Sequence, residues 1–137
     1  MIEAIVWLLL IQDGNIFLLK THNDFGEEYT LIGGHVEPNE SLKKALKREV
    51  KEEIGINIEE KSLILKYVID RRLGTKHKIH FFFLANNWQG SPYNNEPHIH
   101  LEAGWHPLSN LPKNVGPLAS KAINSCNDGQ LFSDYGW

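Results

Sequence analysis

The feature that most constrains the fold is an amphipathic segment between Pro38 and Gly55. Asn39 is the expected N-cap of a helix and Gly55 its expected C′ residue, so the sequence predicts a helix over residues 40–54. Such a helix needs an apolar surface to cover its buried face. That face is formed by apolar residues spaced three or four positions apart, namely Leu42, Ala45, Leu46, Val50 and Ile54.

Short apolar runs on both sides of this helix predict β-strands, because they are rich in β-branched and aromatic residues. Asp13-Gly14 separates the first two runs and is a strong hairpin signal, which makes these strands antiparallel neighbours. Residues 86–102, rich in Asn, Gly, Pro and His, are expected to form a long loop, and Trp105 to begin a short strand. The strands expected before that loop cover residues 5–11, 16–19, 29–32, 63–70 and 78–85.

A second amphipathic helix is expected near the end of the sequence, where Pro117 suits the first turn. Its apolar positions are Leu118, Ala119, Ala122, Ile123 and Cys126. Strands and two helices thus alternate, and a mixed β-sheet with helices on both faces buries all of these apolar surfaces. The predicted fold class is α/β, in one domain over residues 1–137.

Charge and apolar content exclude several classes of function. The formal net charge of −3 provides no concentrated basic surface for a nucleic-acid polymer or an anionic membrane. Cys126 is the only cysteine, so an intrachain disulfide is excluded. The apolar run at residues 5–11 is too short to span a bilayer and lacks a basic flank and a cleavage site. A cytoplasmic location without a membrane partner is therefore expected.

The predicted central helix carries three carboxylates close together. Glu49 lies three residues before Glu52 and four before Glu53, so the three side chains project from one region of the helix surface. They repel one another, and the macrodipole disfavours negative charge in these last turns. A hard cation such as Mg²⁺ prefers clustered carboxylate oxygens and would relieve both penalties. The glutamates alone leave a second interpretation open, a solvated acidic face relieved by Arg48, Lys47 and Lys51.

Residues before the helix favour the metal interpretation. At Gly33-Gly34 no Cβ hinders the approach of a backbone carbonyl to a metal ion or a phosphate. Glu40 opens the predicted helix, and Arg48 is positioned to pair with it or to orient a neighbouring carboxylate.

Together these residues resemble the Nudix box. Gly34 is followed after five residues by Glu40, and after seven more by the run from Arg48 to Ile56, which reads REVKEEIGI. Every fixed position of the pattern is present, and a chance match has a probability on the order of one in a million. Outside the box, the chain from Ile5 to about Ile123 resembles a MutT-like Nudix domain in the order and spacing of its motifs.

The resemblance implies a Nudix α/β/α sandwich and a hydrolase that cuts a pyrophosphate bond in a nucleoside diphosphate linked to another group. The expected substrate is a nucleoside triphosphate, with an oxidised or non-standard base included, cut to a monophosphate and pyrophosphate. ADP-ribose, nucleotide sugars and dinucleoside polyphosphates are alternatives, because the box contacts only the diphosphate and its metal. A Nudix module that senses a nucleotide without cutting it is the alternative from another class. The negative net charge argues against RNA-cap removal, because affinity for RNA rests largely on the neutralisation of phosphates.

The resemblance also implies roles for individual residues. The bound metal, Mg²⁺ or Mn²⁺ as a substitute, would neutralise bridging oxygens and lower the pKa of an attacking water molecule. Arg48 would hold the glutamates in position, and Glu96 would act as a further ligand or base, although an ordinary loop carboxylate is the alternative there. The expected metal-binding residues are Gly34, Glu49, Glu52 and Glu53. The expected catalytic residues are Glu53, Glu52, Arg48 and Glu96.

Three substrate-binding residues are expected: Lys20, Asn114 and His35. Where the MutT branch carries a basic pair, this chain has Lys20-Thr21 and so one cation. Asn114 matches the position of a base-reading asparagine and is predicted to hydrogen-bond a purine edge, with a loop or cap role as the alternative. Contact with phosphate or base is expected from His35 or His80. No cysteine cluster or HExxH motif accompanies the histidines, so zinc is not expected.

The partner expected is a small-molecule nucleotide, and the chain is expected to be a monomer or a homodimer. The aromatic tail Tyr135-Gly136-Trp137 has three open interpretations: it packs on the domain surface, caps the cleft or contacts a dimer partner.

Overall fold

The computed structural model describes residues 1–24 and 26–137. Helix α1 covers Leu42–Ile54 and α2 covers Pro117–Asp128, with a short 3₁₀ helix at Glu60–Ser62. The strands are β1 (Ile2–Leu9), β2 (Ile11–Gln12), β3 (Asn15–Asn23), β4 (Gly26–Thr30), β5 (Ile32–His35), β6 (Leu63–Leu73), β7 (Lys76–Ala85), β8 (His100–Pro107) and β9 (Phe132–Tyr135).

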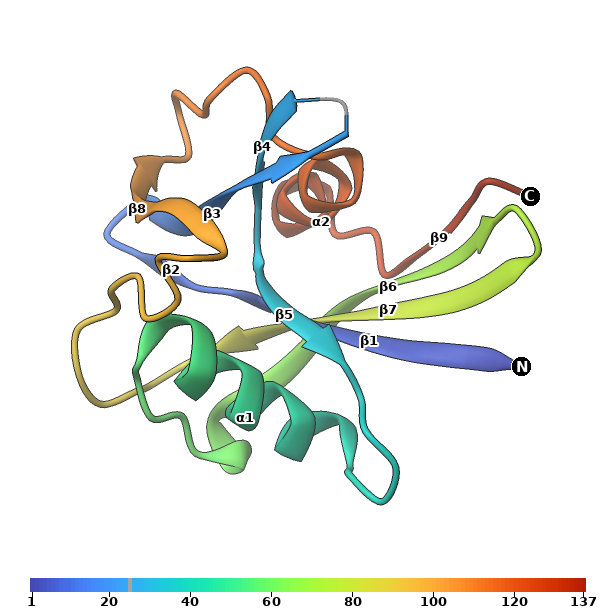
Figure 1. Cartoon of the computed structure of the whole chain (residues 1–137), viewed down its shortest axis with the longest axis horizontal. Helices are drawn as coiled ribbons and strands as arrows, with labels where there is room; N and C mark the ends of the chain where they lie inside the picture. Colours follow the sequence, from blue (N-terminus) through green and yellow to red (C-terminus); the bar gives the residue numbers. More distant parts are fainter. Residues whose placement is uncertain (25) are drawn as a thin grey trace.

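The strands form two sheets. The larger is mixed, with the order β5-β1-β7-β6-β9, and β1 runs antiparallel to β5 but parallel to β7. The smaller is antiparallel, with β3 paired to β2, β4 and β8. Helix α1 lies on one side of the larger sheet and α2 on the other (Figure 1).

Alternation along β1 supplies both faces of the larger sheet with apolar side chains. Val6 and Leu8 belong to the buried cluster that contains Leu46 of α1. Leu9 belongs to a second cluster, which contains Ala122 of α2. This strand is therefore apolar at nearly every position because it is covered on both faces. The predicted α/β class, with a mixed sheet and helices on both faces, is confirmed.

The Asp13-Gly14 turn is present, but it does not join the two strands that the sequence predicts. Both residues have positive φ, 52° and 76°, as a two-residue type I′ hairpin requires. The hairpin pairs only Ile11–Gln12 with β3. Residues 5–9 of the predicted first strand belong to β1, which pairs in the other sheet because β5 and β7 supply its backbone partners.

The start of α1 corrects a second prediction. Asn39 is not the N-cap; it has a φ of 68° and lies in the turn before the helix. Ser41 is the N-cap, and its Oγ accepts a hydrogen bond from the Lys44 N–H at 3.1 Å. The other end follows the prediction, since Gly55 caps the helix with a φ of 71°.

The expected loop over residues 86–102 is too long, because β8 already begins at His100. β3 offers its free edge to this segment, and backbone pairing there outweighs the polar composition that favours a loop. The aromatic tail packs on the domain surface: β9 pairs in parallel with β6, and the Trp137 indole N–H donates to the Asp70 carbonyl at 3.0 Å. Across residues 1–24 and 26–137, no helix is long and apolar enough to cross a membrane.

Candidate functional site

Glu53 occupies the point where α1, β5 and β8 meet. It is 8% exposed, and its Oε1 accepts a hydrogen bond from the Gly33 N–H at 2.7 Å. Its Oε2 lies 3.2 Å from Nε2 of His100 at the start of β8. The buried carboxylate is thus held on both oxygens by groups from two different sheets.

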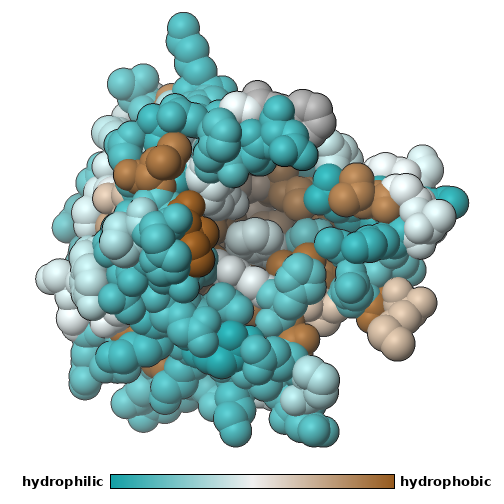
Figure 2. Space-filling model, viewed as in Figure 1, coloured by the Kyte–Doolittle hydropathy of each residue, from teal (hydrophilic) through white to brown (hydrophobic). Residues whose placement is uncertain are grey.

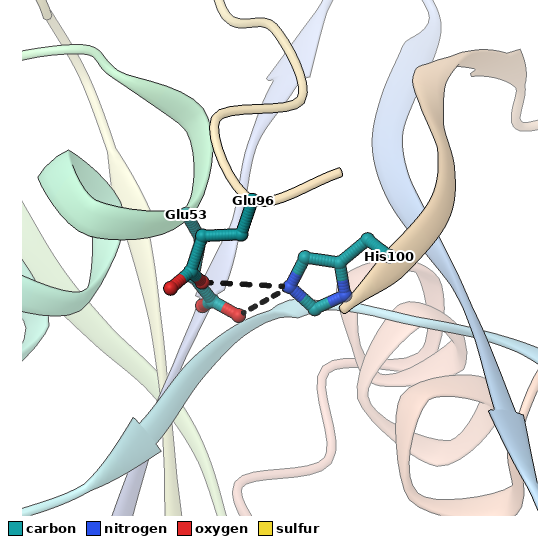
Figure 3. A group of neighbouring side chains, drawn as sticks. All are labelled: Glu53, Glu96 and His100. Atoms are coloured by element: carbon teal, nitrogen blue, oxygen red, sulfur yellow. Dashed lines mark hydrogen bonds and ion pairs between the residues drawn. The ribbon is translucent and has the colours of Figure 1, made fainter. Parts of the chain in front are cut away.

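Glu96 brings a second carboxylate to His100. Its Oε1 lies 3.8 Å from His100 Nε2, and one ligand atom from each of Glu53, Glu96 and His100 lies within 4.8 Å of the others. Figure 3 shows both carboxylates facing one edge of the imidazole ring. The loop is fixed to the end of α1, since the Asn95 N–H donates to the Glu53 carbonyl at 3.0 Å. This cluster has the geometry to hold a divalent metal ion.

Arg48 ties the remaining box residues together. It contacts both carboxylate oxygens of Glu40, through Nε at 2.7 Å and Nη2 at 3.0 Å, in a bidentate pair. Its Nη1 donates to Glu49 Oε1 at 2.9 Å and lies 3.5 Å from Glu52 Oε2. Its Nη2 also donates to the His35 carbonyl at 3.2 Å. One guanidinium therefore orients the carboxylates that the sequence predicts as metal ligands.

Gly34 lies directly against this cluster. A Cβ at this position would lie 2.5 Å from Glu49 Oε1, so only glycine lets the carboxylate approach the strand so closely. Gly33 is equally constrained, because a Cβ there would collide with the Val6 carbonyl oxygen. The two glycines that the sequence singled out therefore make room for Glu49 on one side and for β1 on the other.

The carboxylates of the site differ in pKa. Burial raises the pKa of Glu49 to about 7, and burial also raises the pKa of Glu53. The hydrogen bonds from Arg48 lower the pKa of Glu40 to about 2. Glu49 and Glu53 are crowded carboxylates that resist ionisation, whereas Glu40 is an anion neutralised by Arg48. A cation bound beside Glu53 or Glu49 would favour the charged form of that carboxylate, so these oxygen donors suit a hard divalent ion.

A cavity of about 650 Å³ lies on the α2 side of the larger sheet. It is lined by residues of β1, β4, β6 and β7 and by the first turn of α2, including Trp7, Glu28, Leu31, His80, Phe82 and Leu118. Figure 2 shows a hollow on this face, between β4, α2 and the β6–β7 hairpin. Trp7, in the cavity wall, is the register partner of Gly33, whose N–H binds Glu53. The cavity and the carboxylates therefore flank the same edge strand, β5.

A family model described as NUDIX domain matches residues 1–126. The chain belongs to the Nudix family. The 8-oxo-dGTP diphosphatase of Haemophilus influenzae is 32% identical over 69% of this chain and 70% of the relative. The NAD-capped RNA hydrolase NudC of Pectobacterium atrosepticum is 32% identical over 77% of this chain, which spans only 39% of the length of that relative.

Among solved structures, the MutT NUDIX hydrolase from Burkholderia pseudomallei is similar to this Nudix protein, with a TM-score of 0.82 and 28% identity. The similarity covers 90% of this chain and 97% of that one. The resemblance to the Nudix hydrolases is thereby confirmed, as is the Nudix fold that it implied.

The three predicted substrate-binding residues of this Nudix-family protein lie apart from the cavity wall. Lys20 Nζ pairs with Glu102 at 2.9 Å and with Glu27 at 3.1 Å. The Asn114 side-chain amide donates to the Glu27 carbonyl at 2.9 Å. His35 is exposed, and its carbonyl accepts from Arg48. None of the three is among the described residues that line the cavity.

The sequence predicts His80 as a possible contact to phosphate or base, but it gives only a weak signal for His100. His100 lies in a segment whose composition suggests a loop, and nothing local places it beside Glu53, 47 residues earlier. His80 had the clearer signal, because it is a polar residue directly before the apolar run Phe81-Phe82-Phe83. Alternation on β7 puts His80 and Phe82 on the same face, which is the cavity wall.

His80 is expected to make the stability of this Nudix-family protein sensitive to acid. Burial, together with smaller effects of the nearby Arg71, Lys78 and His35, lowers the pKa of His80 from 6.5 to about 4. Between these two pH values the unfolded chain binds a proton that the folded chain excludes. The free energy of unfolding should therefore fall with falling pH, by up to about 3 kcal/mol from this residue.

The comparison that checks this is urea unfolding of the wild type and of His80→Gln at about pH 7 and about pH 4. The variant should lose less stability than the wild type over this range, because glutamine does not titrate. His98→Gln, the same change at an exposed position, is the matched control and should keep the wild-type slope. Equal slopes for all three proteins would contradict the assignment.

Proposed function

We propose that this Nudix hydrolase cuts a nucleoside triphosphate to the nucleoside monophosphate and pyrophosphate, with Mg²⁺ as its metal. The observation that carries the proposal is the position of Gly33. Its N–H holds Glu53 in the carboxylate cluster, while its register partner Trp7 forms part of the cavity wall. A nucleoside in the cavity could thus extend its phosphates past the edge of β5 to the carboxylates.

The residues of the cluster suit Mg²⁺ chemistry. Glu49, Glu52, Glu53 and Glu96 would hold the ion, with the Gly34 carbonyl as a further ligand, and these are the oxygen donors that it prefers. When bound, Mg²⁺ neutralises phosphate oxygens and lowers the pKa of the attacking water. Mn²⁺ would substitute for it.

The protein's own side chains position the metal-binding carboxylates and accept the proton of the attacking water. Glu53 and Glu96 present oxygens close to each other and to His100, so that one can serve as a ligand while the other accepts the proton of the attacking water. His100 restricts Glu53 to one rotamer, and Arg48 fixes Glu49 and Glu52 without contacting substrate. Catalysis is thus assigned to Glu52, Glu53 and Glu96, with Arg48 as the positioning residue.

The cavity suits a nucleoside. Its volume is within the range of small-molecule sites, and its wall combines apolar and aromatic side chains with charged ones, among them Asp24, Glu28, Arg71 and Lys78. Trp7 and Phe82 provide flat surfaces for the face of a base. The 8-oxo-dGTP diphosphatase relative acts on a purine nucleoside triphosphate, which supports the same substrate class here. Lys20, Asn114 and His35 remain proposed contacts to phosphate or base, although none of them belongs to the cavity wall.

The proposal is tested by a substrate panel with Mg²⁺, in which pyrophosphate and phosphate release are measured separately. Pyrophosphate is expected from canonical or oxidised nucleoside triphosphates. ADP-ribose, NAD, nucleotide sugars and dinucleoside polyphosphates complete the panel, and NAD is included because of the NudC relatives. Turnover confined to these compounds would overturn the substrate class. Nucleotide binding without any turnover in Mg²⁺ or Mn²⁺ would favour a sensor module instead.

A further inference from the structure

His80 has a fixed orientation in the wall of the cavity. It is 2% exposed, and its ring stacks on Trp7 with 6.2 Å between centroids and 10° between planes. Phe82 stacks near it as well, at 6.5 Å and 22°. A ring held between aromatic neighbours has little freedom to turn, so the direction of each ring nitrogen is set by packing.

Trp7 also determines which nitrogen of His80 carries the proton. The Trp7 indole N–H lies 2.9 Å from His80 Nδ1, and an indole nitrogen donates but does not accept. Nδ1 must therefore be the unprotonated, accepting nitrogen. The neutral ring then carries its single proton on Nε2, which makes Nε2 a hydrogen-bond donor.

This donor has no partner within the part of the chain that the structure describes. His80 Nε2 is buried and makes no hydrogen bond, although buried polar groups in folded proteins are nearly always paired. The cavity wall also contains acceptors, on Asp24, Glu28 and Thr30, but none of them makes a hydrogen bond with His80 Nε2. Nε2 itself has almost no accessible surface, so an acceptor on an occupant of the cavity reaches it only when the cavity wall adjusts around that occupant, and the contact then satisfies the donor.

We infer that His80 selects the base of the substrate by donating a hydrogen bond from Nε2 to a carbonyl oxygen of the nucleobase. Trp7 is the positioning residue, because it holds His80 in the donating tautomer. The inference rests on the proposed function in one respect, since it takes a nucleotide as the occupant of the cavity. It adds a substrate class, because it predicts a preference for bases that carry a ring carbonyl, such as hypoxanthine, guanine or an 8-oxopurine. Bases with an amino group or no substituent at the same position should bind more weakly.

The test is equilibrium binding by calorimetry, in EDTA, of nucleoside monophosphates that differ at one atom group. Inosine and adenosine monophosphates form one pair, and 8-oxoguanosine and guanosine monophosphates the other. The wild type is expected to prefer the carbonyl member of at least one pair by about tenfold, the value of one net hydrogen bond. His80→Leu should remove that preference.

Two further variants separate a lost hydrogen bond from a damaged cavity. His80→Gln places an amide N–H near the position of Nε2 and should retain most of the preference. Trp7→Phe keeps an aromatic ring but frees His80 to take either tautomer, so the preference for the carbonyl base should weaken. In a His80→Leu background, Trp7→Phe should not change the preference. ¹⁵N spectra of labelled histidine should show a protonated Nε2 in the wild type and a shift of that signal with inosine monophosphate.

The result that would overturn the inference is nucleotide binding with the same preference in the wild type and in His80→Leu, or no nucleotide binding at all. Binding in EDTA requires neither metal nor turnover. A carbonyl preference that depends on His80 in a protein that hydrolyses nothing would therefore overturn the proposed function and leave this inference standing.

Discussion

Replacing Glu53 with glutamine is expected to reduce Mg²⁺-dependent hydrolysis by a factor on the order of 10²–10⁴, the usual contribution of a group that transfers a proton. The amide keeps the size of the carboxylate and an oxygen that can accept from the Gly33 N–H. It removes the negative charge that a metal ion would contact, together with the ability to accept a proton. The loss should appear in kcat for whichever substrate the panel identifies.

The fold of Glu53→Gln should stay intact. Burial already raises the pKa of Glu53, so the protein pays a desolvation cost for the ionised form that a neutral amide avoids. Urea unfolding should therefore show stability equal to or above that of the wild type. Glu60→Gln, the same change at an exposed residue of the 3₁₀ helix, should leave both activity and stability unchanged. Full activity of Glu53→Gln at wild-type stability would contradict the proposed mechanism.

The parts of the site that the sequence could predict are those set by local geometry. Helical spacing alone puts Glu49, Glu52 and Glu53 on one region of α1, and Arg48 reaches Glu49 and Glu52 within one turn. The glycine pair before the helix could also be interpreted, because only a residue without Cβ permits close approach. The class of chemistry follows from these few residues, which explains why it could be predicted.

The rest of the site depends on contacts between segments far apart in the sequence. His100 reaches Glu53 only because β8 pairs with the free edge of β3, and no period within residues 86–102 indicates that pairing. The cavity likewise needs β1 and β7 to lie side by side, which brings Trp7 next to His80 although 73 residues separate them. The composition of residues 86–102 predicts a loop. The apolar runs of β1 and β7 predict buried strands, but they do not indicate which strands pair with each other.

The substrate-binding predictions show a different limit. The predictions for Lys20 and Asn114 rest on the resemblance to MutT-like proteins, and in this chain both residues bind atoms of Glu27. A matched position carries no information about the neighbours that a side chain finds in a particular protein. Of the two histidines for which the sequence predicts a contact to phosphate or base, His80 lines the cavity and His35 does not, while Glu28 lines it without having been predicted. Substrate choice is therefore better argued from the cavity than from the matched positions.

Removing the Arg48 side chain is expected to have the second largest effect. Arg48→Ala should lower activity by about 10–100-fold, the range for a residue that orients metal ligands. It should also lower the free energy of unfolding, because Glu40 loses two charge-assisted hydrogen bonds. Lys47→Ala, an exposed cation next to it on the same helix, is the control and should change neither.

Two further variants separate the effect on stability from the effect on activity. In Arg48→Lys, one ammonium cannot reproduce the bidentate contact with Glu40, so both losses should be intermediate. In the double variant Glu40→Gln with Arg48→Ala, the unpaired charge of Glu40 is gone and part of the stability should return. Activity should stay low, since Glu49 and Glu52 still lack the group that orients them. If activity returned together with stability, Arg48 would serve the fold alone and not the arrangement of the carboxylates.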